Sequence, residues 1–163
     1  MSDEVVVDSV VVDVPVVSRE PSVFCDDEVT HEISVDIYFD PTQKNSIVAV
    51  RRSDSTEVPE LKKKTEVFTF SQPKYDNLMD YRQSSSVFVG GSFRVDPIKF
   101  RQMLLLKNLI GWTVKGKDGN IVPIKKDEEG GFLSDDSIVY LNKIAPSVLD
   151  VVMALYEKKL LLA

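Results

Sequence analysis

The stretch from Asp96 to Ile124 constrains the fold of this chain more than any other part of the sequence. It reads DPIKFRQMLLLKNLIGWTVKGKDGNIVPI, so a leucine-rich segment ends at a glycine before a tryptophan and an Asp-Gly pair. Asp96 is typical of a helix N-cap, and Pro97 suits the first helical position. The apolar stripe continues through Ile110, and Gly111 provides a stop. The pattern predicts a broadly buried helix followed by a hairpin.

Residues 112–124 are expected to form this hairpin. Asp118-Gly119 supplies the turn, because this pair can adopt the positive φ that tight hairpins require. Pro123 has no amide hydrogen to donate, which marks the returning strand as a sheet edge. Trp112 is a lone tryptophan after a helix, and core packing is favoured over ligand stacking for its side chain.

The residues before this module predict a small antiparallel sheet or hairpins. Apolar residues alternate over 33–39, and shorter strands are expected over 47–51 and 65–70. Residues 52–64 are polar, so the whole stretch, with the lysine run Lys62–Lys64, is expected to be a solvated loop.

A helix is expected over Pro73–Ser85, because helical spacing places Tyr75, Leu78 and Met79 on one face. A short extended piece at Val87–Val89 and a flexible joint at Gly90-Gly91 follow this helix.

Two further helices are expected to close the chain, which makes the whole an α+β protein. Ser134 is suited to cap a helix running to about Lys143, and Pro146 is suited to begin the last helix. The chain ends on the apolar residues Leu160, Leu161 and Leu162, for which two interpretations stay open. They either dock into the core or form a subunit contact.

Residues 1–30 differ in kind from the single domain expected over 31–163, which is β-rich over 31–70 and helical over 73–163. They contain VVVDSVVVDVPVV, where Val10, Val11 and Val12 stand between aspartates. Dense valine favours extended backbone, and the aspartates and Pro15 are typical guards against edge-to-edge pairing. An acidic extended arm is predicted, either as a flexible tail or as a strand added to a sheet edge.

The charge distribution also separates this arm from the rest of the chain. Residues 1–40 hold eleven acids and one base, a net charge of −10, whereas residues 41–163 hold fifteen acids and nineteen bases, a net charge of +4. Phosphates would repel the arm, so nucleic acid is not expected as a partner. Neither a positively charged signal segment nor an apolar run of about 20 residues is present, so a soluble protein is expected.

Candidate catalytic and metal-binding groups are sparse. The only cysteine, Cys25, and the only histidine, His31, lie in or beside the acidic arm, and no oxyanion hole is evident near them. Asp26, Asp27 and Glu28 could join His31 around a metal, but a solvated acidic stretch is favoured because these residues are local in sequence. No phosphate-binding loop is present. We expect no catalytic residue, no cofactor and no metal site.

The Asp96–Leu155 stretch resembles the tail assembly chaperones of long-tailed bacteriophages. The resemblance rests on an Asp-led leucine-rich helix, a tryptophan, an Asp-Gly hairpin ending in Val-Pro, and closing helices. The matching positions are Asp96, Leu105, Leu109, Trp112, Asp118, Gly119, Val122, Pro123, Leu141 and Leu149. Two features depart from that pattern, namely the acidic valine arm and a longer loop at Lys125–Gly131.

The resemblance implies a non-enzymatic phage morphogenesis protein that binds a tape-measure-like polypeptide in the host cytoplasm. The departures leave open a structural virion component, such as a head–tail joining, neck or baseplate protein. That component would use its arm for subunit contacts and could be a homo-oligomer. Both alternatives imply protein partners, with no role for a membrane. The candidate interaction residues are Val10, Val11, Val12, Trp112, Pro123, Leu160, Leu161 and Leu162.

Overall fold

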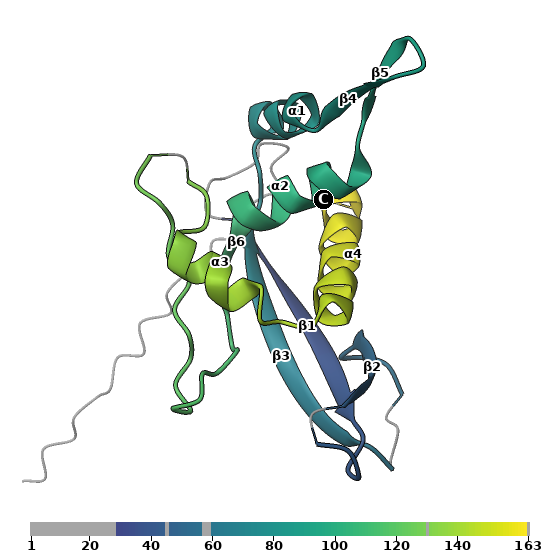
Figure 1. Ribbon diagram of the computed structural model, residues 1–163, viewed down its shortest axis with the longest axis vertical. Helices are drawn as coiled ribbons and strands as arrows, with labels where there is room; N and C mark the ends of the chain where they lie inside the picture. The colour runs from purple at the N-terminus through teal and green to yellow at the C-terminus, as the bar shows by residue number, and fades with distance from the viewer. Residues whose placement is uncertain (1–28, 45, 57–59, 130, 163) are drawn as a thin grey trace, which may run out of the picture.

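The computed structural model describes residues 29–44, 46–56, 60–129 and 131–162, and the fold is α+β, as the sequence predicted. These residues form a four-stranded antiparallel sheet, a separate two-stranded hairpin and four helices (Figure 1). The strands are β1 (Thr30–Phe39), β2 (Ile47–Arg52), β3 (Lys62–Ser71), β4 (Ser86–Val89), β5 (Ser92–Val95) and β6 (Leu109–Trp112). The helices are α1 (Tyr75–Ser84), α2 (Pro97–Asn108), α3 (Asp135–Leu141) and α4 (Pro146–Leu162).

The main sheet has the strand order β2-β1-β3-β6, so the two longest strands lie at its centre. β1 pairs with β3 along its whole length, from Thr30 opposite Ser71 to Phe39 opposite Lys62. The strands predicted over 33–39, 47–51 and 65–70 are confirmed. β1 begins at Thr30, one residue before the boundary predicted for the domain, and the predicted arm otherwise lies almost entirely outside the described residues.

One face of this sheet carries the main core. Ile33, Val35 and Phe68 are each at most 2% exposed. Side chains alternate along a strand, so these residues share the face against which α4 packs, and Figure 1 shows α4 beside β1. The buried side chains of α4 follow helical spacing, which confirms the last predicted helix; they are Val148, Val152, Met153 and Tyr156.

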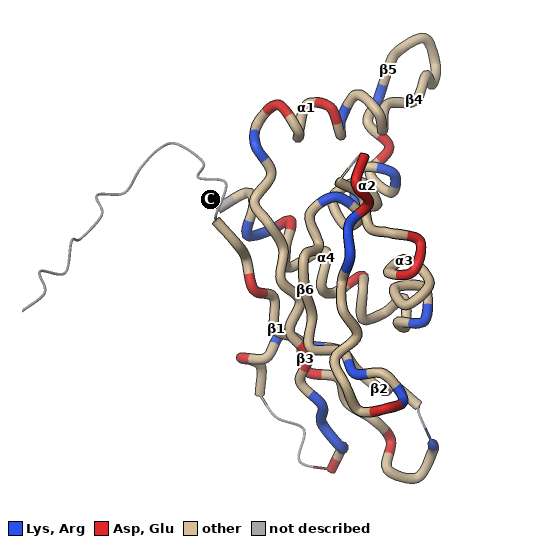
Figure 2. The backbone as a smooth tube through the Cα atoms, turned by 90° about the vertical axis from the view of Figure 1, so that its left-hand side faces the viewer, with Lys and Arg blue, Asp and Glu red and all other residues tan. Residues whose placement is uncertain are grey.

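The prediction of a loop over Lys62–Lys64 is wrong, because β3 begins at Lys62. Figure 2 shows the blue of lysine and arginine along the start of β3. Two buried carboxylates provide the physical reason. Glu66 forms an ion pair with Lys64, and Asp36 on β1 lies with a carboxylate oxygen 4.0 Å from Lys63 Nζ. Pairing with β1 together with these ion pairs holds the lysines in a strand, although lysine has a low intrinsic preference for strands.

The central helix ends earlier than predicted. α2 stops at Asn108, and Leu109–Trp112 forms the edge strand β6 beside β3, so Leu109 and Ile110 do not continue the helix. Leu109 pairs with Phe70, and Trp112 pairs with Phe68. Extended backbone lets the Leu109 and Trp112 side chains enter the core while the main chain pairs with β3. Local helix propensity does not reveal this gain in backbone hydrogen bonds.

The start of α2 is as predicted. The Asp96 carboxylate accepts hydrogen bonds from the amides of Ile98, at 2.9 Å, and Lys99, at 3.3 Å. These bonds satisfy two of the amide groups that every helix leaves open at its N-terminus.

Replacing Asp96 by alanine is expected to lower the free energy of unfolding by about 0.5–2 kcal/mol, because both capping bonds are lost. Urea denaturation followed by circular dichroism measures this change. Asp96→Asn is the control, since asparagine caps helices about as well as aspartate. Equal losses in the two variants would show that the charge of Asp96, rather than its capping geometry, stabilises α2.

Residues 86–95 form a hairpin that the sequence prediction missed. Gly90 and Gly91 have φ values of 59° and 83°, so they make the tight turn between β4 and β5 rather than a flexible joint. The helix before this hairpin is confirmed as α1, but its predicted apolar face is buried only in part. Leu78 packs against the core. Tyr75 and Met79, however, are 71% and 43% exposed, and Tyr81 is the buried residue of α1.

The Asp118-Gly119 turn is confirmed, with Gly119 at a φ of 80°. The flanking residues are joined by an isolated bridge between Lys115 and Ile121 rather than by regular strands. The prediction that Pro123 lies in an edge strand is therefore wrong, because Pro123 lies in an irregular segment after the turn. The helix capped by Ser134 is also confirmed, although α3 ends at Leu141, two residues before Lys143.

Candidate functional site

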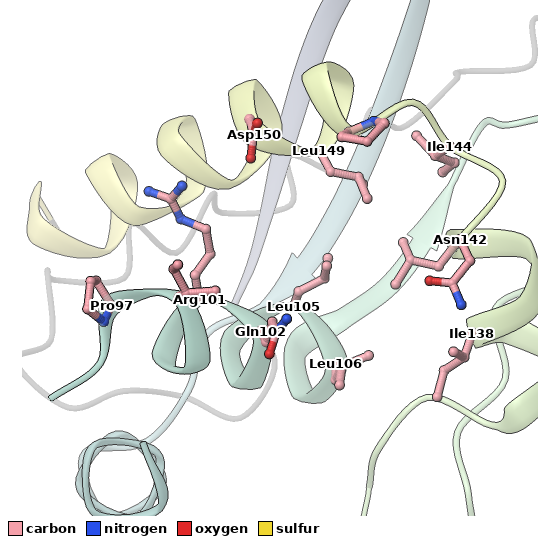
Figure 3. Close-up of a pocket in the computed structure, with 13 residues that line it drawn as sticks. Pro97, Arg101, Gln102, Leu105, Leu106, Ile138, Asn142, Ile144, Leu149 and Asp150 are labelled. Carbon is pink, nitrogen blue, oxygen red and sulfur yellow. The ribbon is translucent and has the colours of Figure 1, made fainter. Parts of the chain in front are cut away.

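A groove opens between α2 on one side and α3 with the start of α4 on the other (Figure 3). Its volume is about 820 Å³, within the range of roughly 300–1,000 Å³ that is common for binding sites. Apolar side chains form most of its walls, including Leu105 and Leu106 from α2, Ile138 from α3, and Ile144 and Leu149 around the start of α4.

These wall residues are only half-buried. Leu105, Leu106, Ile138 and Leu149 pack against the core on one side and keep part of their apolar surface accessible on the other. Ile98, at the end of the groove, is 70% exposed. The groove therefore offers contiguous apolar surface to a partner, a feature that marks interaction sites in soluble proteins.

Arg101 is a cation that lines the groove and is already paired with a carboxylate. Arg101 forms a two-pronged ion pair with Glu157 of α4, with Nε 2.8 Å from Oε1 and the second nitrogen 2.9 Å from Oε2. Hydrogen bonding to Glu157 is the main cause of the raised pKa of Arg101, so the guanidinium stays charged. Asp150 contributes an exposed carboxylate to the rim. The interior thus suits an apolar segment, which needs no charged counterpart.

His31, the only histidine of the chain, has one polar and one aromatic neighbour. His31 Nε2 lies 3.1 Å from the Gln72 side-chain oxygen, and the imidazole ring packs against Tyr156 at a centroid distance of 6.1 Å. Among the described residues, no three histidine, cysteine or carboxylate side chains gather as a metal site would require. Cys25 and the acids Asp26, Asp27 and Glu28 lie outside the described residues.

The structure separates the candidate interaction residues. Val10, Val11 and Val12 and the side chain of Leu162 lie outside the described part of the chain. Leu160 packs against the core, whereas Leu161 is 88% exposed at the end of α4, and neither residue lines the groove. Leu160 thus follows the interpretation of docking into the core, whereas the subunit contact stays a prediction.

Trp112 is 6% exposed and belongs to the core, as the favoured interpretation predicted. Its ring meets Phe68 edge-on at a centroid distance of 6.1 Å, and its Nε1 donates a hydrogen bond to the Val122 carbonyl at 2.6 Å. Trp112 also lines a second hollow of about 630 Å³, together with the exposed Pro123. Trp112 and Pro123 therefore lie together on this second hollow, which shares only Ile144 with the groove.

Sequence reasoning missed the groove, although one signal for it existed. Leu105 and Leu106 widen the apolar stripe of α2 beyond what packing on one side requires. Burial on several sides was the expected consequence, yet both leucines remain half-buried because α3 and α4 stand apart from α2 at this point.

The β4–β5 hairpin is a second exposed apolar surface, and it projects from the body in Figures 1 and 2. Phe88 and Phe93 form a cross-strand ring pair at 5.2 Å, yet they are 64% and 77% exposed.

Lys126 closes the far end of α2. Its Nζ donates hydrogen bonds to the carbonyl oxygens of Lys107, at 2.7 Å, and Leu106, at 3.2 Å, two of the acceptors that a helix C-terminus leaves open. Burial, aided by the charge of Lys107, lowers the pKa of Lys126 from 10.5 to about 8.

This pKa gives a testable dependence of stability on pH. The folded protein releases the Lys126 proton near pH 8, whereas the unfolded chain holds it up to about pH 10.5, so the unfolded state binds more protons between these values. The free energy of unfolding should therefore rise through this window relative to that of Lys126→Met, and the difference should be flat below it. Chemical denaturation of both proteins at a series of pH values measures the difference. A constant or falling difference would contradict the burial of this amine.

Among the described residues, no single helix is long and apolar enough to cross a membrane. The pair α3 and α4, bent by 107° at the break between them, meets that test by length and composition together.

Comparisons of the chain with protein-family models, with curated proteins and with solved structures gave no match.

Proposed function

We propose that this protein is a non-enzymatic binding protein whose groove holds an apolar segment of another polypeptide. The observation that carries the proposal is the half-buried apolar wall formed by Leu105, Leu106, Ile138 and Leu149, with Arg101 at the rim already paired to Glu157. A helical segment that lays an apolar face into such a groove would bury both surfaces, which is a recurrent mode of peptide recognition.

The resemblance of Asp96–Leu155 to tail assembly chaperones supports a more specific form of this proposal. Three of the positions that carry the resemblance, Leu105, Leu141 and Leu149, line the groove. The partner would then be a tape-measure-like protein, which the groove would keep soluble in the host cytoplasm during phage assembly.

Co-expression with a tape-measure protein tests this proposal, and α3 offers a matched pair of variants. Ile138 lines the groove, whereas its neighbour Val139 is 54% exposed and is not a lining residue. The wild-type protein and Val139→Glu should raise the soluble fraction of the tape-measure protein, and Ile138→Glu should not. A charge inside the groove would have to be desolvated when the apolar segment binds.

Two results would count against the proposal. Co-expression with the wild-type protein could leave the tape-measure protein insoluble, or Ile138→Glu and Val139→Glu could behave alike. Circular dichroism of both variants establishes that each is folded before they are compared.

A second candidate function is a structural virion component whose acidic arm adds as a strand to a neighbouring subunit. The observation that favours it is the position of β2 at the edge of the sheet, with Val48 54% exposed. Mass spectrometry of purified virions distinguishes the two functions. Many copies in the particle would favour the virion component, whereas absence from particles and abundance in infected-cell lysate would favour the chaperone.

A further inference from the structure

The second hollow, of about 630 Å³, differs from the groove in its charge. It lies between the irregular hairpin around Asp118-Gly119 and the end of α3. Three exposed lysines, Lys115, Lys117 and Lys143, line it against one acid, Asp118. None of these lysines forms an ion pair with a carboxylate among the described residues. The hollow is therefore cationic.

The same hollow has apolar walls. Trp112 and Val122 form its buried part, while Ile121 and Tyr140 are 54% and 42% exposed at its surface. An occupant that matches both properties must combine apolar side chains with negative charge. A purely apolar segment would leave the lysines without acidic counterparts, and a purely acidic segment would leave Ile121 and Tyr140 without an apolar cover.

One segment of this chain has that combination. Residues 5–17 read VVVDSVVVDVPVV, which is nine valines with Asp8 and Asp13 among them, and residues 1–28 together carry eight acids and one base. The arm is thus apolar and acidic, as the hollow requires. The groove beside α2 is a poorer match, because its one arginine is already paired with Glu157.

The segment that joins residues 5–17 to β1 is long enough for these residues to reach the hollow. Val17 is separated from Thr30, where β1 begins, by residues 18–29, which can span roughly 40 Å when extended. Thr30 lies three residues before Ile33 on β1. Ile33 pairs with Phe68 on β3, and Phe68 pairs with Trp112 on β6, so Trp112 lies two strands away from Ile33. Strand spacing and rise place the Trp112 backbone on the order of 15 Å from Thr30.

We infer that residues 5–17 dock into the lysine-rimmed hollow of the same chain, with valines covering Ile121 and Tyr140 and with Asp8 and Asp13 facing Lys115, Lys117 and Lys143. Docking shields the valines of the arm and the exposed apolar side chains of the hollow from water. The inference is independent of the groove, because the two hollows share only Ile144 among their lining residues.

Hydrogen–deuterium exchange of the full-length protein tests the inference. Docking protects the amides of residues 115–121, and Asp8→Lys/Asp13→Lys should accelerate their exchange about tenfold by releasing the arm. Asp26→Lys/Asp27→Lys is the matched control, since it changes the net charge of the arm equally outside the docking segment. Val10→Ser/Val11→Ser/Val12→Ser should have the same effect as the first variant, because it removes the apolar half of the match.

A charge exchange separates direct pairing from a general effect of charge. Adding Lys115→Asp/Lys143→Asp to Asp8→Lys/Asp13→Lys should restore slow exchange, because each lysine–aspartate attraction is rebuilt in reverse. Unchanged exchange in Asp8→Lys/Asp13→Lys would overturn the inference, as would an equal effect of Asp26→Lys/Asp27→Lys. Protection that increases with protein concentration would also overturn it, because the occupant would then be the arm of a second copy.

Discussion

Replacing Tyr156 by alanine is expected to lower the free energy of unfolding by about 3–5 kcal/mol, a loss typical of a buried aromatic residue. Tyr156 is fully buried on α4 and stacks on Phe70 of β3, with the ring centroids 4.2 Å apart and the planes inclined by 16°. Its hydroxyl donates a hydrogen bond to the Ser71 carbonyl at 2.8 Å. This one side chain therefore joins the last helix to the end of a central strand.

Urea denaturation monitored by circular dichroism measures this loss. Tyr156→Phe serves as the control, because it keeps the stacked ring and removes only the hydrogen bond, at an expected cost of about 0.5–1.5 kcal/mol. Burial raises the pKa of the Tyr156 phenol, so the group remains neutral and its contribution should not change near neutral pH. A loss of less than about 1 kcal/mol in Tyr156→Ala would contradict the packing of α4 on the sheet.

Replacing Trp112 by alanine is expected to have an effect of similar size, about 3–5 kcal/mol. The substitution removes the edge-on contact with Phe68 and leaves the Val122 carbonyl without the bond from Nε1. Trp112→Phe keeps apolar volume but loses this donor, so an intermediate loss of about 1–3 kcal/mol is expected.

The Trp112 variants also decide between two roles for this residue. Because the side chain is 6% exposed, the main effect should be on stability, measured by denaturation with circular dichroism. Unchanged stability together with weaker binding of a polypeptide partner would instead identify Trp112 as a contact residue. Val139→Ala, at a 54% exposed position, controls for the effect of truncating a surface side chain.

Much of the fold could be predicted because its signals are local. Ile33, Val35 and Ile37 alternate along β1, and Asp96 and Ser134 each accept hydrogen bonds at the helix starts that their positions predicted. Period-two burial and N-caps depend on residues a few positions apart, so a single sequence displays them.

The errors arose where distant residues decide the local structure. Lys62–Lys64 looks like a loop until Asp36 and Glu66 are in place beside it, and Leu109 looks helical until Phe70 lies opposite. Gly90-Gly91 is a different case, because Phe88 and Phe93 pair only five positions apart; the backbone freedom of glycine suits both a joint and a tight turn. Tertiary pairing outweighs intrinsic propensity at Lys62–Lys64 and at Leu109.

The groove could not be predicted for a related reason. The apolar stripes of α2 and α4 were visible, but a stripe that is buried and a stripe that lines a groove have the same sequence pattern. Only the separation between α2 and α3 distinguishes the two kinds of stripe. That separation depends on how the loop before α3 is held against the end of α2. Lys126 Nζ and the Leu133 amide both donate hydrogen bonds to the Leu106 carbonyl there.

The measurement that tests the proposed function most directly is a titration of the isotope-labelled, full-length protein with a helical peptide from an apolar segment of a tape-measure protein, followed by NMR. Amide shifts should concentrate in α2, α3 and the first turns of α4, around Leu105, Ile138 and Leu149, and should disappear in Ile138→Glu but persist in Val139→Glu. Shifts confined to β2, or no shifts at all, would contradict a polypeptide-binding role for the groove.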